Sequence, residues 1–200
     1  DHVSVSEGSI TGGVDFELNE AGSITGRILD ESGAPVAGAS LFVRDKDGNL
    51  LERISMQTSS ASGEFTYGGV APGRYFVSAH AELLSTPAGV TAEVRSGEAT
   101  TIELNLEPAT ILRITCVDAE GNPVIANIEV RDSGGLDYAG QFGMNDLEKM
   151  LTEDFSTTTR NVGPLPPGKY KVIATMGDLA VTKPVSLTGR STRKLTIRVK

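Results

Sequence analysis

Hydrophobic and polar residues alternate along much of the chain with a period of two, which is typical of β-strands with one face in a core and one in solvent. Residues 23–28 place Ile24 and Ile28 on one side and polar residues on the other. Residues 112–116 place Cys116 beside apolar neighbours, so we expect a buried thiol that behaves as a small hydrophobe. The same alternation recurs in the segments 75–79, 102–106, 170–174 and 195–199.

Turn-forming residues separate these alternating runs. Glycine, proline and asparagine, which suit tight turns, occur in the segments 32–33, 47–49, 62–63, 72–73, 96–97, 121–123 and 167–168. About seven short strands in every 90 residues or so, with turns every 8–12 residues, indicate a β-sandwich. We therefore predict an all-β fold. One departure is the segment 145–151, where Asn145 and Glu148 have the spacing of a helix cap and predict one or two helical turns.

Four short stretches recur, in the same order, about 90 residues further along the chain. The pairs are 17–19 with 103–105, 30–36 with 118–124, 43–45 with 130–132, and 72–75 with 167–170. Repeats of this kind predict two tandem copies of one module, at 21–107 and 108–200. The spacing widens between the last two pairs, so the second copy carries an insertion within 133–164.

Residues 1–20 precede both copies. Their sequence resembles residues 94–104, the closing stretch of the first copy. We expect them to be the trailing strand or strands of a preceding repeat. The alternative is an N-terminal arm that packs on the first module.

The composition excludes several classes of partner. The chain has 18 Lys and Arg against 26 Asp and Glu, which gives a net charge of −8. Nucleic acids and anionic membrane surfaces attract basic proteins, so we expect neither as a partner. We also expect no membrane insertion, because no apolar run reaches the roughly 20 residues that span a bilayer. A single cysteine allows no internal disulfide.

The sequence offers no convincing catalytic or metal-binding motif. His2 and His80 lack the spacing of metal ligands, and alternation puts His80 on a polar face. Residues 45–49 resemble half of a calcium loop, but the glycine and Glu52 stand at the wrong positions, so a hairpin turn explains them better. We predict no metal, no cofactor and no enzymatic activity.

Several motifs of the first copy resemble the carboxypeptidase regulatory-like domain family. They are the stretches Gly22–Ala39, Gly63–Tyr67 and Ala71–Ala79. The second copy keeps Gly121–Val124 and Pro166–Tyr170 and departs from the pattern between them. The resemblance implies a prealbumin-like (transthyretin-like, Ig-like) seven-stranded β-sandwich. It also implies a non-catalytic accessory module of secreted and surface proteins.

These observations predict a structural or interaction module of a larger extracytoplasmic repeat protein, whether secreted, periplasmic or on the cell surface. Its partners would be neighbouring repeats or other proteins. The alternative is a carbohydrate-binding module with a starch-binding-like sandwich. The candidate contact residues are Tyr138, Phe142, Met144, Tyr67 and Phe76.

Two further expectations concern particular segments. Tyr75 and Tyr170 follow Pro-Gly turns, so we expect buried rings whose hydroxyl groups bond to the backbone. We also expect contacts outside the cores to involve residues 133–164 more than their shorter counterpart, 46–69.

Overall fold

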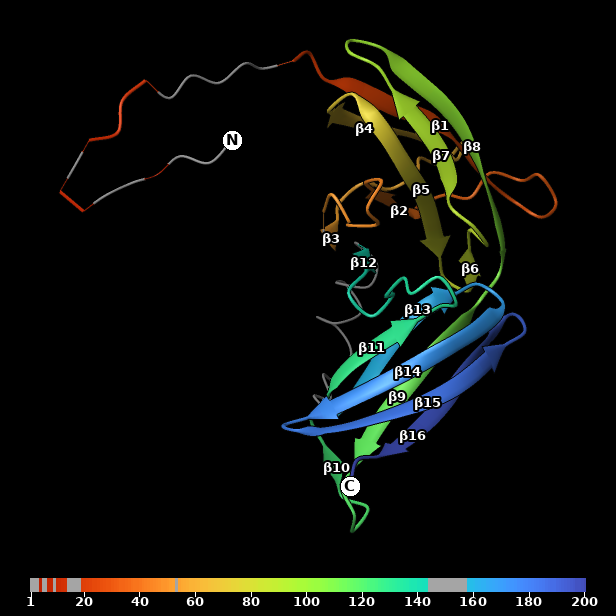
Figure 1. Cartoon of the computed structure of the whole chain (residues 1–200). Helices are drawn as coiled ribbons and strands as arrows, with labels where there is room; N and C mark the ends of the chain where they lie inside the picture. Colours follow the sequence, from red (N-terminus) through yellow and green to blue (C-terminus); the bar gives the residue numbers. More distant parts are fainter. Residues whose placement is uncertain (1–3, 5–6, 9, 14–18, 53, 144–157) are drawn as a thin grey trace.

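The computed structural model describes residues 4, 7–8, 10–13, 19–52, 54–143 and 158–200 (Figure 1). They form an all-β fold, as the alternation predicts. The helix expected at 145–151 and most of residues 1–20 lie outside the described residues, so those predictions stay predictions. No helix in the described part of the chain is long and apolar enough to cross a membrane.

The first half of the structure, residues 22–108, is a two-layered sandwich. Its strands are β1 (Gly22–Asp30), β2 (Ser40–Arg44), β3 (Ile54–Ser55), β4 (Glu64–Val70), β5 (Gly73–Ala81), β6 (Leu84–Ser85), β7 (Val90–Val94) and β8 (Ala99–Pro108). In one layer β1 lies between antiparallel β4 and parallel β8. In the other, β5 lies between β2 and β7. Short β6 pairs with both β5 and β8 and so links the layers.

The second half, residues 110–200, has a similar arrangement. Its strands are β9 (Thr110–Val117), β10 (Pro123–Val124), β11 (Asn127–Arg131), β12 (Phe142–Gly143), β13 (Thr159–Leu165), β14 (Gly168–Met176), β15 (Leu179–Leu187) and β16 (Ser191–Arg198). Here β9 lies between antiparallel β13 and parallel β16, and it also pairs with β10. The opposite layer has β14 between β11 and β15.

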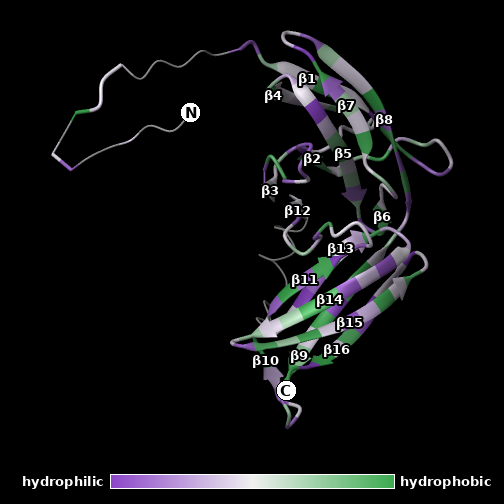
Figure 2. Ribbon diagram, viewed as in Figure 1, coloured by the Kyte–Doolittle hydropathy of each residue, from purple (hydrophilic) through white to green (hydrophobic). Residues whose placement is uncertain are grey.

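Each half has its own hydrophobic core between its two layers. The strand faces agree with the alternation, since Ile24 and Ile28 are fully buried in the first core. Cys116 is buried in the second core, and this burial raises the pKa of its thiol. Figure 2 shows hydrophobic and hydrophilic residues alternating along the strands. The hydroxyl groups of Tyr75 and Tyr170 donate to the carbonyl oxygens of residues 71 and 166, at 2.9 and 2.7 Å, as predicted.

Aspartates close several of the turns by the same arrangement. Among the described residues these aspartates are Asp30, Asp45, Asp118 and Asp132. Each Oδ1 accepts two backbone N–H groups, and a glycine three residues later has a positive φ. Side-chain hydrogen bonds from Ser32 and Asn122, followed by these backbone bonds, hold the pKa of Asp30 and Asp118 below the usual value. The backbone bond from residue 49 is the first cause of the lowered pKa of Asp45. The stretch that resembles a calcium loop is one of these turns.

The two halves meet at a short, buried joint. β8 ends at Pro108 and β9 begins at Thr110, so Ala109 alone separates them, and it is fully buried. Its N–H donates to Leu83 O at 2.7 Å, and its carbonyl accepts from Ser191 N at 3.3 Å. A second connection lies to one side, where β12 pairs in parallel with β3 (Figure 1). The halves are therefore held together by backbone hydrogen bonds from several segments.

Candidate functional site

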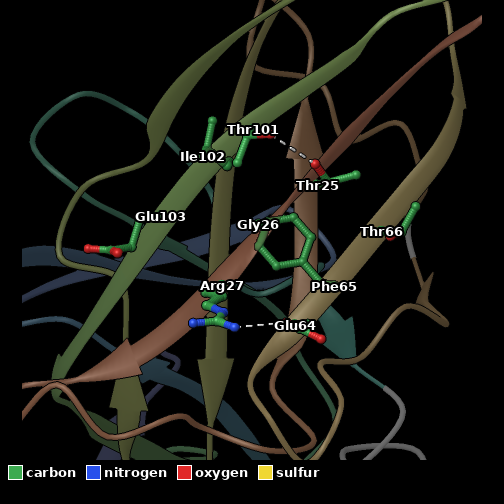
Figure 3. A pocket seen from close by; sticks show the side chains of 9 residues that line it. All are labelled: Thr25, Gly26, Arg27, Glu64, Phe65, Thr66, Thr101, Ile102 and Glu103. Atoms are coloured by element: carbon green, nitrogen blue, oxygen red, sulfur yellow. Dashed lines mark hydrogen bonds and ion pairs between the residues drawn. The ribbon is translucent and has the colours of Figure 1, made fainter.

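Two of the hollows on the surface of the described residues differ in character. The first is an open depression over β4, β1 and β8 (Figure 3). Arg27, Glu64 and Glu103 are its charged residues. Arg27 is already paired with Glu64, at 3.0 Å between Nη2 and Oε1, and both of these side chains are more than half exposed. The ring of Phe65 is buried in the core. This hollow is therefore a polar, solvated surface and a weak candidate for a binding site.

The second hollow lies between the two halves, and we call it the joint pocket. It has a volume of about 220 Å³. Its first wall is the outer face of β2 and β5 together with residues 85–89. Its second wall comes from the other half, from Leu136, Tyr138 and Gln141. The pocket therefore exists only because the halves are held together.

The outer face of β2 is buried, unlike an ordinary sandwich face. Phe42 is only 2% exposed and packs against His80, with the ring centroids 4.7 Å apart. The expectation that His80 lies on the surface is wrong, since its side chain is buried. Alternation correctly puts His80 on the outer face of β5, but that face is covered by Phe42 and the joint. A period of two cannot distinguish a covered outer face from a solvated one.

Arg44 is a charged residue buried in the wall of the joint pocket. Its side chain is only 8% exposed, and its Nη1 donates to Gly48 O at 2.8 Å. Within the described structure, Nε and Nη2 are buried and have no hydrogen-bond partner. These two atoms form one edge of the planar guanidinium and would donate side by side. Burial lowers the pKa of Arg44, and this effect is opposed by Tyr138, Asp137 and Asp132 across the joint.

The carboxylates near Arg44 are occupied by their own loop. Asp137 Oδ1 accepts the N–H groups of Val130 and Ala139, at 2.9 and 3.0 Å. Asp132 Oδ2 accepts the Tyr138 hydroxyl at 3.4 Å. Burial, followed by the charge of Asp132, raises the pKa of Tyr138 to about 12. The joint pocket thus combines a neutral tyrosine with an arginine whose Nε and Nη2 edge is bonded to no carboxylate among the described residues.

The predicted contact residues fall into different surroundings. Phe76 and Tyr138 both line the joint pocket, although they are far apart in the sequence. Tyr67 lies in the first core, 6% exposed, and its pKa is raised to about 12, chiefly by burial. The backbone of Phe142 pairs with β3, and Met144 lies outside the described residues.

Arg44 and Phe42 escaped the sequence prediction. A signal was present, because residues 41–43 form an uninterrupted apolar run where alternation would place a polar residue. Such a run indicates a strand that is covered on both faces. The insertion segment does contact the first half, through β12. Its partner β3 lies in the shorter counterpart 46–69, so both segments share this contact.

The comparison with known families gives one match. Residues 23–107 match the carboxypeptidase regulatory-like domain family. The match covers the first sandwich, where the resemblance in sequence also lies. A comparison with curated proteins gives no match.

Several solved structures resemble the chain weakly. The TIE protein of Bacillus anthracis has a TM-score of 0.37 and 19% identity, over 90% of this chain and 34% of that one. BcpA, the major pilin subunit of Bacillus cereus, has a TM-score of 0.38 and 10% identity, over 90% and 99% of the two chains. GBS52, the minor pilin of Streptococcus agalactiae, has a TM-score of 0.35 and 13% identity, over 88% and 94%. Scores this low support no conclusion about function. The chain spans about a third of the TIE protein.

Proposed function

We propose that the chain is a non-catalytic structural segment of a larger extracytoplasmic protein. Residues 21–107 and 108–200 are two β-sandwich modules in series, and together they act as a stiff spacer. A spacer of this kind sets the distance and orientation between whatever lies at its two ends. The match of the first module to the carboxypeptidase regulatory-like family supports a non-catalytic role.

The observation that carries this proposal is the absence of a linker at the joint. Ala109 is fully buried and bonded through both its N–H and its carbonyl group. Flexible linkers are exposed, polar and several residues long, and they let domains reorient. A single buried residue between two strands, backed by the β3–β12 pairing, opposes such motion.

The direction of the strands also suits a spacer. β1 begins beside the start of β8, and β8 ends at the joint. β16 ends beside the end of β9, and β9 starts at the joint. The chain therefore enters the first module and leaves the second at the ends away from the joint. Tension between these ends would pass along both pairs of parallel strands.

Distance measurements between two spin labels test the stiffness. We would place the labels at Thr66→Cys and Lys194→Cys, both exposed, in a Cys116→Val background. Pulsed electron resonance should give one narrow distance distribution. Inserting Gly-Ser-Gly-Ser after Ala109 should broaden it, whereas the same insertion after Gly33, at the tip of a turn, should not. A native distribution as broad as that of the joint insertion would contradict the proposal.

A glycan array distinguishes the spacer from the carbohydrate-binding alternative. The spacer proposal expects no glycan to bind above background. Specific binding of one glycan class, lost on Phe76→Ala, would favour the alternative. Circular dichroism of the native chain and of Phe76→Ala checks that both proteins on the array are folded.

A further inference from the structure

The unfilled edge of Arg44 needs an explanation. A buried charge without a hydrogen-bond partner is unfavourable, and such groups in proteins are normally paired. The Nε and Nη2 edge of arginine matches the two oxygens of a carboxylate, which accept two parallel hydrogen bonds. Within the described part of the chain, no hydrogen bond fills this edge.

The charge around the joint pocket limits what an occupant could carry. Asp132 and Asp137 lie close enough to oppose the lowering of the Arg44 pKa by burial. With these carboxylates nearby, a doubly charged anion such as phosphate would be repelled more strongly than a monoanion. A single carboxylate matches both the charge and the geometry of the arginine edge.

The walls of the joint pocket indicate the rest of the occupant. Beyond Arg44 they are largely aromatic and apolar, with Phe42, Phe76, Leu136 and Tyr138. The volume is about 220 Å³. An apolar cavity of about 150 Å³ can hold benzene, so this pocket has room for one ring and a carboxylate. Faces of aromatic rings suit another aromatic or apolar group.

We propose that the joint pocket binds a compact monocarboxylate with an aromatic or apolar body. Its two oxygens accept hydrogen bonds from Nε and Nη2 of Arg44, and its body packs against Phe76 and Tyr138. The same chemistry is offered by a free small acid and by the C-terminal residue of a peptide. The ligand touches both halves, so it would also strengthen the joint.

Access to the arginine edge requires a local movement. Nε and Nη2 are shielded from solvent, and Nη1 is held by the Gly48 carbonyl. Gly48 lies in the exposed turn of residues 45–49, which projects beyond β2. An outward shift of this turn would open the edge to the ligand. Loops of this kind move more readily than strands.

Titration with benzoate tests the proposal on the whole chain. Benzoate supplies the ring and the carboxylate, and benzamide is a neutral match of the same shape. We expect benzoate to shift the amide NMR signals of residues around Arg44 and Tyr138, and benzamide to bind at least about tenfold more weakly. Equal binding of the two probes, or no binding of benzoate up to its solubility limit, would overturn the proposal.

Variants identify the site. Arg44→Gln should remove benzoate binding, and the matched Arg131→Gln, on the exposed end of β11, should leave it unchanged. Ala88→Trp covers the mouth of the pocket from an exposed position and keeps Arg44, so it should also abolish binding if the pocket is the site. Unchanged benzoate affinity in folded Arg44→Gln or Ala88→Trp would refute the assignment.

Two further probes distinguish the sources of the carboxylate. N-acetylphenylalanine mimics the end of a peptide, and N-acetylphenylalanine amide lacks the charge. If the former binds more tightly than benzoate, the natural ligand is a peptide terminus. If only benzoate binds, the ligand is a free acid, and both results support the proposal. The stiffness measured without ligand is independent of this test, so the spacer proposal and the binding proposal can fail separately.

Discussion

Arg44 and Arg131 end matching strands of the two halves, and both stand in the sequence Val-Arg-Asp. Arg131 is exposed, and its Nε donates to Glu129 Oε2 at 2.8 Å. Arg44 is 8% exposed, and its Nε and Nη2 edge has no hydrogen-bond partner in the part of the chain that the structure describes. The same local sequence therefore produces a solvated ion pair in one half and a buried, incompletely paired charge in the other.

The residue two positions earlier accounts for the difference. In the second half it is Glu129, which pairs with the arginine in solvent. In the first half it is Phe42, whose ring is buried at the joint. The outer face of a sandwich can therefore be exposed to solvent or covered by a neighbouring segment. An aromatic residue on that face marks where the neighbour packs.

The first strands of the two halves, β1 and β9, also differ at one matching inward position. Gly26 in β1 stands where β9 has Ile114. A Cβ atom at Gly26 would lie 1.8 Å from the Ile102 carbonyl oxygen and 3.2 Å from the ring of Phe65 (Figure 3). Opposite Ile114 the paired strand carries Arg160 instead of a buried phenylalanine. The glycine is therefore required by the close approach of β8 and the large ring beside it.

The largest expected effect comes from Gly26→Ala. The added methyl group collides with a backbone carbonyl, so β1 and β8 must separate, and the free energy of unfolding should fall by about 3 kcal/mol or more. Urea unfolding followed by circular dichroism measures this. Gly68→Ala in β4, whose Cβ would meet nothing within 4 Å, is the control and should change little. Similar free energies of unfolding for the two variants would mean that β8 does not approach Gly26 as closely as the structure indicates.

Phe42→Ala should have the next largest effect. Removing a buried phenylalanine ring lowers the free energy of unfolding by about 3 kcal/mol. The matched change Glu129→Ala removes a side chain that is 31% exposed and should lower the free energy of unfolding by less than about 0.5 kcal/mol. Equal effects in urea unfolding would show that the outer faces of β2 and β11 are equally solvated, and would break the comparison.

Tyr75→Phe and Tyr170→Phe probe a feature that the halves share. Each change removes one hydroxyl group and its bond to a backbone carbonyl, which should lower the free energy of unfolding by about 1 kcal/mol. The Tyr170 bond is the more buried of the two, so its loss should be the larger. Urea unfolding of both variants measures the difference. No loss in either would contradict a stabilising role for these bonds.

The smallest expected effect is a change of stability with pH, common to both halves. The pKa values of Asp30, Asp45 and Asp118 are lower in the folded chain than their usual values. Their contribution is therefore present above about pH 4 and is lost as pH falls through the folded pKa values. The urea midpoint should decline over that range.

Asparagine variants assign this decline to the turns. Asp30→Asn and Asp118→Asn should each make the acid-side decline shallower, and by similar amounts, because the two turns match. Glu120→Gln removes an equal charge from the Asp118 turn and serves as the control. A decline as steep in both aspartate variants as in the control would rule out the turn carboxylates as its cause.

Much of the fold could be predicted from short stretches of sequence. Alternation correctly assigned Ile28 and Cys116 to cores, and the Pro-Gly turns correctly predicted the buried Tyr75 and Tyr170. These features depend on residues that are neighbours along the chain. The prediction failed at His80, because the period of two gives the face of a strand but not what covers it.

The joint pocket could not be predicted from the sequence. Phe76 and Tyr138 were both candidates, but nothing in the sequence indicated that they line one pocket. Arg44 was not among the candidates, and its Val-Arg-Asp stretch recurs at Arg131. In the structure, Arg44 lines a pocket together with Leu136, Tyr138 and Gln141 of the other half, whereas Arg131 is exposed.

The sequence by itself determined the all-β class, the inward faces of the strands and the positions of the turns. Each of these follows from local propensity and from a period of two, which need no knowledge of distant residues. The tertiary structure decided which outer face is covered, where the two halves meet and which charge is buried there. Those outcomes depend on segments far apart in the chain, since the pocket that Arg44 lines is also lined by residues 136–141 of the other half. The linker-free joint at Ala109 brings these segments together.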